Sequence, residues 1–216
     1  MTYHALRTRL GAALLLGLLG TPCAVNAALI LDPANDFIAS FTGAHSGDID
    51  VISTYAIYDG TAFHIGGTMN AAIGTLPTSL YVFGFNRGTG TAGFAAIGVG
   101  NVLFDAVITM TGAGVLGGRL LPEAAAINVA TMTKTITGSS FQIDIPAVLL
   151  PARGLTPDHY GINLWPRDTS QVGAAAVSDF APDNATFIAS APEPLSIGLF
   201  ASGLVCLMAA VRRRSV

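Results

Sequence analysis

The feature of this 216-residue chain that most constrains its fold is a set of short runs in which apolar residues occupy every second position. Four runs show the pattern: 81–85, 102–110, 141–145 and 160–164. A β-strand points successive side chains to opposite faces, so each run predicts a strand with one buried face. Glycine, proline and asparagine separate the runs and predict tight turns between the strands.

The same signals predict a hairpin early in the chain. Residues 51–58 are rich in β-branched and aromatic residues, and Asp59-Gly60 follows as a strong hairpin-turn signal. Apolar residues then alternate again over 63–73. A single stretch, 122–127, is typical of a helical turn, because proline favours the first position of a helix.

These runs predict about eight to eleven short strands, and no amphipathic segment is long enough to be the crossover helix of a parallel sheet. Glutamate and lysine, which are common on soluble helices, are rare between residues 28 and 190, where Glu123 and Lys134 are the sole examples. The sequence therefore predicts an all-β fold, an antiparallel β-sandwich or a jelly-roll-like body.

Residues 1–27 have the three-part layout of a secretory signal peptide. A basic start leads into an apolar stretch at 10–20, and the predicted cleavage lies between Ala27 and Ala28. The apolar stretch is shorter than the roughly twenty residues that a membrane span needs, which favours a cleaved signal helix over a permanent anchor. A lipoprotein signal at Cys23 is a further alternative, although the proline before it fits that signal poorly.

The C-terminal segment, 191–216, carries a second set of signals. They are the triplet Pro192, Glu193 and Pro194, an uncharged span at 195–211, and a basic end at 212–216 with Arg212, Arg213 and Arg214. As a helix the span would cover about 25 Å, enough for a thin hydrocarbon core. Arginines favour the cytoplasmic side, so the sequence predicts a C-terminal transmembrane helix with the body outside the cytoplasm.

This order of parts resembles the PEP-CTERM sorting domain of Gram-negative bacteria. The resemblance covers about residues 192–216, and Ala191 stands where that family commonly has valine. It implies an exosortase-type sorting enzyme as a partner, acting near the triplet while the tail is held in the inner membrane. It also implies a route to the cell surface or extracellular matrix of a bacterium that makes exopolysaccharide and biofilm.

Residues 28–190 form the predicted extracytoplasmic domain. Both cysteines, Cys23 and Cys206, fall in the flanking signals, so the domain has no disulfide and depends on packing for its stability. The domain carries twelve acidic and five basic residues, a formal charge of −7. Such an acidic body lacks the basic surface that nucleic acid or anionic lipid requires, so neither is expected as its partner.

Two acidic segments predict a structural calcium site. Asp48 and Asp50 lie in GDID, and Asp179 and Asp183 lie in SDFAPDN. Calcium takes six to eight oxygen ligands, and loops at one end of a sandwich can bring distant segments to one ion. The alternative is that these aspartates form Asx turns and caps. No other cofactor is expected.

Catalytic motifs are weak or absent in the sequence. Residues 88–93 match the G-x-G-x-x-G pattern, but a strand-like run follows instead of the helix that dinucleotide binding requires, so we interpret them as a glycine-rich hairpin loop. The chain has no G-x-S-x-G or H-E-x-x-H motif, and its body has no cysteine for a Cys-His pair. We therefore expect no enzyme, although paired aspartates for glycoside hydrolysis stay open.

The segment 159–168 has the densest mixture of aromatic and polar residues. Asn163 and Trp165 share one face of the predicted strand and are candidate glycan contacts; the alternative is that this lone tryptophan packs in the core. Two hypotheses follow. The chain is an exported, non-enzymatic surface or matrix protein associated with exopolysaccharide, or its body is a carbohydrate-binding or carbohydrate-active β-sandwich.

Overall fold

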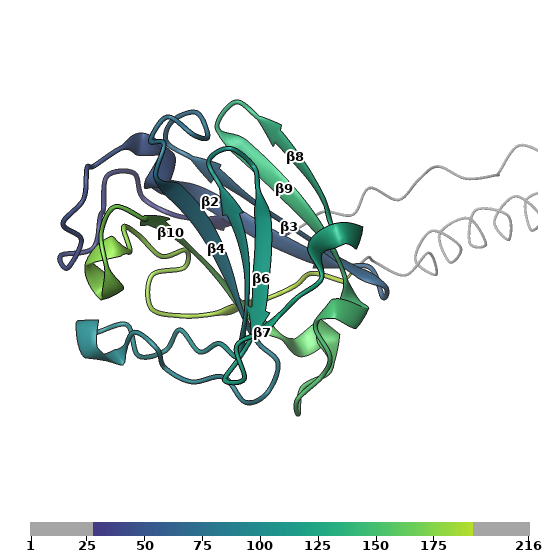
Figure 1. Cartoon of the computed structure of the whole chain (residues 1–216). Helices are drawn as coiled ribbons and strands as arrows, with labels where there is room; N and C mark the ends of the chain where they lie inside the picture. The colour runs from purple at the N-terminus through teal and green to yellow at the C-terminus, as the bar shows by residue number, and fades with distance from the viewer. Residues whose placement is uncertain (1–27, 192–216) are drawn as a thin grey trace, which may run out of the picture. The chain divides into compact units, whose positions relative to one another are not determined.

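The computed structural model describes residues 28–191, and the predicted signal peptide and C-terminal sorting signal lie outside the described residues. Within 28–191, no helix has the length and apolar character needed to cross a membrane. The described residues form eleven strands in two sheets, and all neighbouring strands within each sheet run antiparallel (Figure 1). The prediction of an all-β antiparallel body is confirmed.

The first sheet has five strands in the order β1-β2-β3-β9-β8. Their bounds are β1 Ile30–Leu31, β2 Val51–Tyr58, β3 Ala62–Met69, β9 Ser140–Pro146 and β8 Thr133–Thr137. The second sheet has six strands in the order β11-β10-β4-β5-β6-β7. Their bounds are β11 Phe187–Ile188, β10 Gly161–Asp168, β4 Ser79–Asn86, β5 Ala106–Thr111, β6 Leu116–Leu120 and β7 Ala125–Ala126.

Short 3-10 helices occur in the connections between strands. They are η1 Gly47–Ile49, η2 Ala95–Ile97, η3 Val129–Thr131, η4 Ala147–Leu149, η5 Pro157–His159 and η6 Gly173–Ala176. The predicted hairpin joins β2 to β3, with Gly60 at φ 97° in the turn. Glycine adopts this left-handed conformation without the steric cost that a side chain would bring.

One hydrophobic core lies between the two sheets. It is built from the alternating apolar residues of β3 and β9 on one side and of β4, β5 and β10 on the other. Phe63 of β3 packs on Phe85 of β4 with ring centroids 5.5 Å apart, and on Tyr160, just before β10, at 5.7 Å. The period-two pattern that predicts the strands therefore also supplies the contacts between the layers.

A second hydrophobic cluster covers the other face of the second sheet. Its buried members are Val82, Val102, Trp165, Val177 and Phe180. Phe94 and Phe104, from the loop between β4 and β5, pack on Trp165 with centroid distances of 5.2 and 4.9 Å. A Cβ atom on Gly84 would lie 2.3 Å from the Trp165 ring, so glycine in β4 makes room for the indole.

Ala28 and Ser190 lie side by side although they are far apart in the sequence. The backbone N–H of Ala28 donates to Ser190 Oγ at 2.9 Å. Ser190 also pairs with β2, because its N–H donates to the Ala56 carbonyl at 2.9 Å and its carbonyl accepts from Tyr58 at 3.0 Å. Since β11 pairs with β10, the last residues of the body contact both sheets in turn.

Three sequence predictions of secondary structure differ from the structure. The run at 63–73 stays a strand only to Met69, and two further differences have a clear physical reason. Residues 121–124 form a turn and Ala125–Ala126 pair with β6, so the predicted helical turn at 122–127 does not form. The run 102–110 becomes a strand only from Ala106, because its first residues close the loop over the second cluster. The segment 121–126 is set by pairing within the β6–β7 hairpin and the start of the run 102–110 by packing of the loop on the second cluster, and in both places these contacts override the local preference.

Trp165→Ala should lower the free energy of unfolding by about 3–5 kcal/mol, because it removes a large buried ring and leaves a cavity. Val172→Ala is a matched control, since Val172 is 84% exposed and its truncation should change stability by less than about 0.5 kcal/mol. Urea unfolding of both variants measures this difference. An unchanged midpoint for Trp165→Ala would contradict its place in a packed cluster.

Candidate functional site

Five aspartates gather where the N-terminal segment, the start of β2 and the segment after β10 meet. We call them the aspartate cluster: Asp32, Asp36, Asp50, Asp179 and Asp183. Asp32, Asp36 and Asp183 each offer a carboxylate oxygen within 4.8 Å of the others, and Asp36, Asp50 and Asp179 do the same. Because Asp36 belongs to both groups, the five carboxylates form one continuous site.

Main-chain hydrogen bonds fix the two buried members of the cluster. Asp50 accepts from the Asn35 N–H at 3.0 Å and from Asn70 Nδ2 at 2.8 Å. Asp179 accepts from the N–H of Val51 at 2.8 Å and from its own neighbour Phe180 at 2.7 Å. Val51, the first residue of β2, therefore helps to hold Asp179, which is distant in sequence, while Asn35 and Asn70 hold Asp50.

The electrostatics of the cluster are unfavourable for five negative charges. Burial first, and then repulsion from neighbouring carboxylates, raise the pKa of Asp32 to about 7 and the pKa of Asp179 to about 9. Burial likewise raises the pKa of Asp36. In the described part of the chain, none of the five forms an ion pair with lysine, arginine or histidine. Their mutual repulsion is therefore not balanced by cationic side chains.

The cluster includes three of the four aspartates that the sequence predicted as calcium ligands: Asp50, Asp179 and Asp183. The fourth, Asp48, lies elsewhere, because it is fully buried and accepts from Ser46 Oγ at 2.6 Å and Leu76 N–H at 2.9 Å. Its role is to join two loops. Sequence reasoning missed Asp32 and Asp36, which the pattern D-x-x-x-D in LDPANDF could have indicated.

The predicted glycan contact at Asn163 and Trp165 is wrong. The two residues share a face of β10 as expected, but they are 1% and 2% exposed because loops cover that face. Asn163 Nδ2 donates to the carbonyls of Pro182 at 2.6 Å and Ala185 at 2.8 Å, which holds the segment after β10. Neither side chain is accessible to a sugar.

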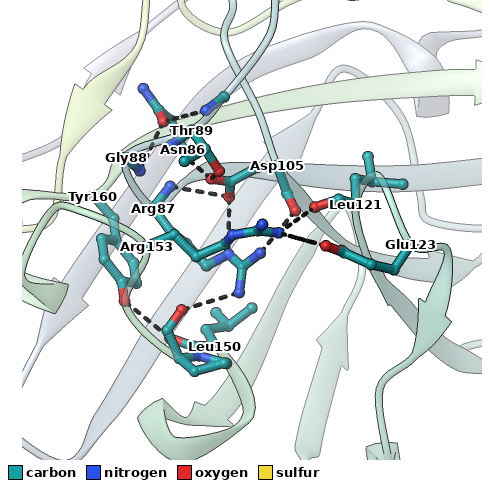
Figure 2. Close-up of polar contacts among 12 residues, drawn as sticks. Asn86, Arg87, Gly88, Thr89, Asp105, Leu121, Glu123, Leu150, Arg153 and Tyr160 are labelled. Atoms are coloured by element: carbon teal, nitrogen blue, oxygen red, sulfur yellow. Dashed lines mark hydrogen bonds and ion pairs between the residues drawn. The ribbon is translucent and has the colours of Figure 1, made fainter.

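The glycine-rich segment 88–93 begins the loop between β4 and β5, as the sequence indicated. Asn86 Oδ1 accepts from the N–H groups of Gly88 at 3.0 Å and Gly90 at 2.9 Å (Figure 2). The residues that follow form η2, a 3-10 turn of three residues. No α-helix therefore begins here, and the segment does not have the context of a dinucleotide site.

A buried ion pair closes this loop (Figure 2). Arg87 Nε lies 2.8 Å from Asp105 Oδ1, and the two side chains are 1% and 2% exposed. Asp105 also accepts from the Thr89 N–H at 3.0 Å and Oγ1 at 2.8 Å. The remaining Arg87 nitrogens donate to the carbonyls of Pro151 and Asp105, both at 3.0 Å. All these contacts are internal, so the pair is structural.

A cavity of about 340 Å³ lies beside this ion pair. Its lining residues are Arg87, Leu120, Glu123, Ala125, Pro151 and Arg153. Arg153 Nη1 lies 3.2 Å from the Glu123 carboxylate and donates to the Leu121 carbonyl at 2.9 Å (Figure 2). The charged groups around the cavity are therefore paired with one another, which gives a ligand no free charge to bind.

The outer face of the first sheet carries a polar network around His64. His64 Nδ1 lies 2.8 Å from Asp144 Oδ1, and Nε2 lies 3.1 Å from Asp59 Oδ2. The hydrogen bond to Asp144 raises the pKa of His64, burial partly opposes this, and Asp59 adds to the rise. The same contact with His64 holds the pKa of Asp59 well below its usual range.

Tyr55 lies on the same outer face. A Cβ atom on Gly66 would lie 2.5 Å from Tyr55 Cε1 and 2.7 Å from Cζ, so the ring packs directly on bare glycine backbone. Tyr55 Oη donates to Gln142 Oε1 at 2.8 Å, so the Tyr55 side chain extends from β2 across β3 to β9. The side chain is partly exposed, so part of the ring stays accessible to solvent.

No protein-family model and no curated protein matches the chain. The chain's own residues therefore carry any functional assignment.

His64→Gln should destabilise the fold more at pH 5.5 than at pH 9. The pKa of His64 is raised on folding, so its stabilising contribution is present below the unfolded pKa and is lost as pH rises through the folded pKa. The difference should be on the order of 1 kcal/mol or less, because about a third of each paired side chain is exposed.

Urea unfolding at the two pH values measures this effect. His159→Gln is the control, since its side chain is 63% exposed and should contribute equally little at both. Equal destabilisation by His64→Gln at both pH values would show that its ion pairs do not stabilise the fold.

Proposed function

We propose that the chain is an exported, non-enzymatic surface or matrix protein with a β-sandwich body. The observation that carries the proposal is the tail sequence, with Pro-Glu-Pro at 192–194, an uncharged span at 195–211 and arginines at 212–214. It is joined by the signal-peptide layout of residues 1–27. The signal peptide directs export and the tail holds the protein in the inner membrane. An exosortase-type enzyme then passes the body to the surface or matrix, where it associates with exopolysaccharide.

The boundaries of the fold support this order of events. Among the described residues the first strand begins at Ile30, after the predicted cleavage between Ala27 and Ala28, and the last strand ends at Ile188, before the triplet. Cleavage at both signals would therefore leave every strand of the two sheets in place. The shared core between two antiparallel sheets supports the sandwich form of the body.

The intact mass of the native protein in separated membrane and matrix fractions tests the sorting step. We expect a matrix species that starts near Ala28 and ends near Pro194. Glu193→Ala should shift the protein to a membrane species that keeps its arginines, because the triplet is altered. Asp158→Ala, an exposed change in the body, is the control. A wild-type protein that keeps Arg212–Arg214 in every fraction would refute sorting by cleavage.

Carbohydrate binding at the outer face of the first sheet is a second candidate, and the placement of Tyr55 favours it. Its ring packs on Gly66 and its hydroxyl donates to Gln142. From Gln142 a line of hydrogen bonds continues through Asp144 to Thr133 on β8, so amide, carboxylate and hydroxyl groups extend from one edge of the ring across the sheet. A flat ring edged by such groups suits the apolar face and hydroxyls of a sugar. This site replaces the buried Trp165.

Affinity electrophoresis through gels containing the producer's purified exopolysaccharide tests this second candidate. Tyr55→Ala should remove the retardation of the native protein, whereas Val172→Ala should keep it, since that residue is exposed elsewhere. The melting temperature of both variants checks that they are folded. If the folded Tyr55→Ala variant is still retarded in the exopolysaccharide gel, the outer face of the first sheet is not the carbohydrate-binding surface.

A further inference from the structure

The aspartate cluster gathers five carboxyl groups that no cationic side chain among the described residues neutralises. Five carboxylates lie in two overlapping groups, and within residues 28–191 none of them pairs with a cationic side chain. Asp50 and Asp179 are fully buried. Removing carboxylates from water without a cationic partner is costly, because neither solvent nor a counter-charge stabilises them.

A second observation, independent of the crowding, concerns individual oxygen atoms. Asp32 Oδ2 and Asp36 Oδ1 are buried and have no hydrogen-bond donor. Buried acceptors are normally satisfied, and each one that is not costs the free energy of its lost hydration. Both orphaned oxygens belong to the cluster, and one of them belongs to the residue that both groups share. A bound cation would satisfy both at once.

We infer that the aspartate cluster binds a calcium ion, which ties residues 32–36 and 179–183 to the start of β2. The ligand set consists of oxygen atoms, the donors that hard cations prefer over transition metals. Calcium accepts six to eight oxygens in irregular geometry, which suits carboxylates from three separate segments. Magnesium requires near-octahedral geometry and keeps several waters, so it fits an all-protein carboxylate cage less well.

The surrounding hydrogen bonds prepare the cluster for an ion. The N–H groups of Asn35, Val51 and Phe180 orient Asp50 and Asp179. Each carboxylate oxygen has further lone pairs, so these bonds leave room for coordination. Such bonds to ligands hold donor atoms in position before the metal arrives. The ion would therefore complete an existing arrangement and stabilise the folded state by mass action.

Calcium titration of full-length protein in detergent, stripped with EGTA, tests the inference directly. Calorimetry should give saturable binding with a dissociation constant at or below about 1 mM. A hundredfold excess of Ca²⁺ over that constant should raise the Tm by roughly 5–10 °C. The same concentration of Mg²⁺ should give a smaller rise, and an equal rise would overturn the choice of calcium.

Three single substitutions locate the ion. Asp36→Asn should weaken calcium binding at least about tenfold, because it removes a charged ligand shared by both groups, and Asp183→Asn should weaken it while leaving the buried members intact. Asp158→Asn, exposed and outside the cluster, should bind like wild type. If Asp36→Asn does not fold, Asp183→Asn carries the test.

The order of the melting temperatures of Asp36→Asn and wild type should reverse between EGTA and calcium. This reversal distinguishes an ion site from an acidic patch without an ion. In EGTA, Asp36→Asn should melt at or above the wild-type temperature, because one repelling charge is gone. In calcium it should melt below wild type. The inference fails if wild type shows neither binding heat nor a Tm shift up to about 10 mM Ca²⁺, tenfold above the weakest extracellular sites. It also fails if both cluster variants bind like wild type.

Discussion

The ion pair between Arg87 and Asp105 is the contact on which the second sheet depends. These residues are the first and last of the loop between β4 and β5, so their pairing closes the loop on itself. The closed loop lays Phe94 and Phe104 over Trp165 and gives the sheet a second buried face. Removing one partner would leave a buried charge uncompensated and free the loop that covers the indole.

The body thus buries charge in two contrasting ways. At Asp105 the carboxylate receives hydrogen bonds from Arg87 and Thr89, and a cationic side chain lies against it. In the aspartate cluster the carboxylates face one another, and Asp32 and Asp36 keep oxygens without donors. The fold thus supplies hydrogen-bond donors and a positive charge to one buried carboxylate, Asp105, but not to the carboxylates of Asp32 and Asp36. The calcium ion proposed above would do for the aspartate cluster what Arg87 does for Asp105.

The sequence predicted the parts of the fold that depend on one strand and its turn. The run 141–145 becomes the inner face of β9, and Asp59-Gly60 makes the expected hairpin. Periodicity could not show that loops bury Trp165, because a period of two separates two faces without saying what covers either. Asp48 and Asp50 occur in similar positions of one sequence segment, yet Asp48 lies within the 3-10 helix η1 and Asp50 at its end, and they have different partners. Strand pairing, not local preference, likewise decides the turn at 122–127.

The last residues of the body also have a mechanical consequence. Phe187 and Ile188 pair with β10 in one sheet, and Ser190 then pairs with β2 in the other. This short segment fastens the layers together at the point where the tail leaves the body. Tension transmitted through an anchored tail would act on these few hydrogen bonds before it reached the core. Residues 187–190 would detach from the sheets first. The remaining strands of both sheets would stay folded under a load that broke only these last contacts.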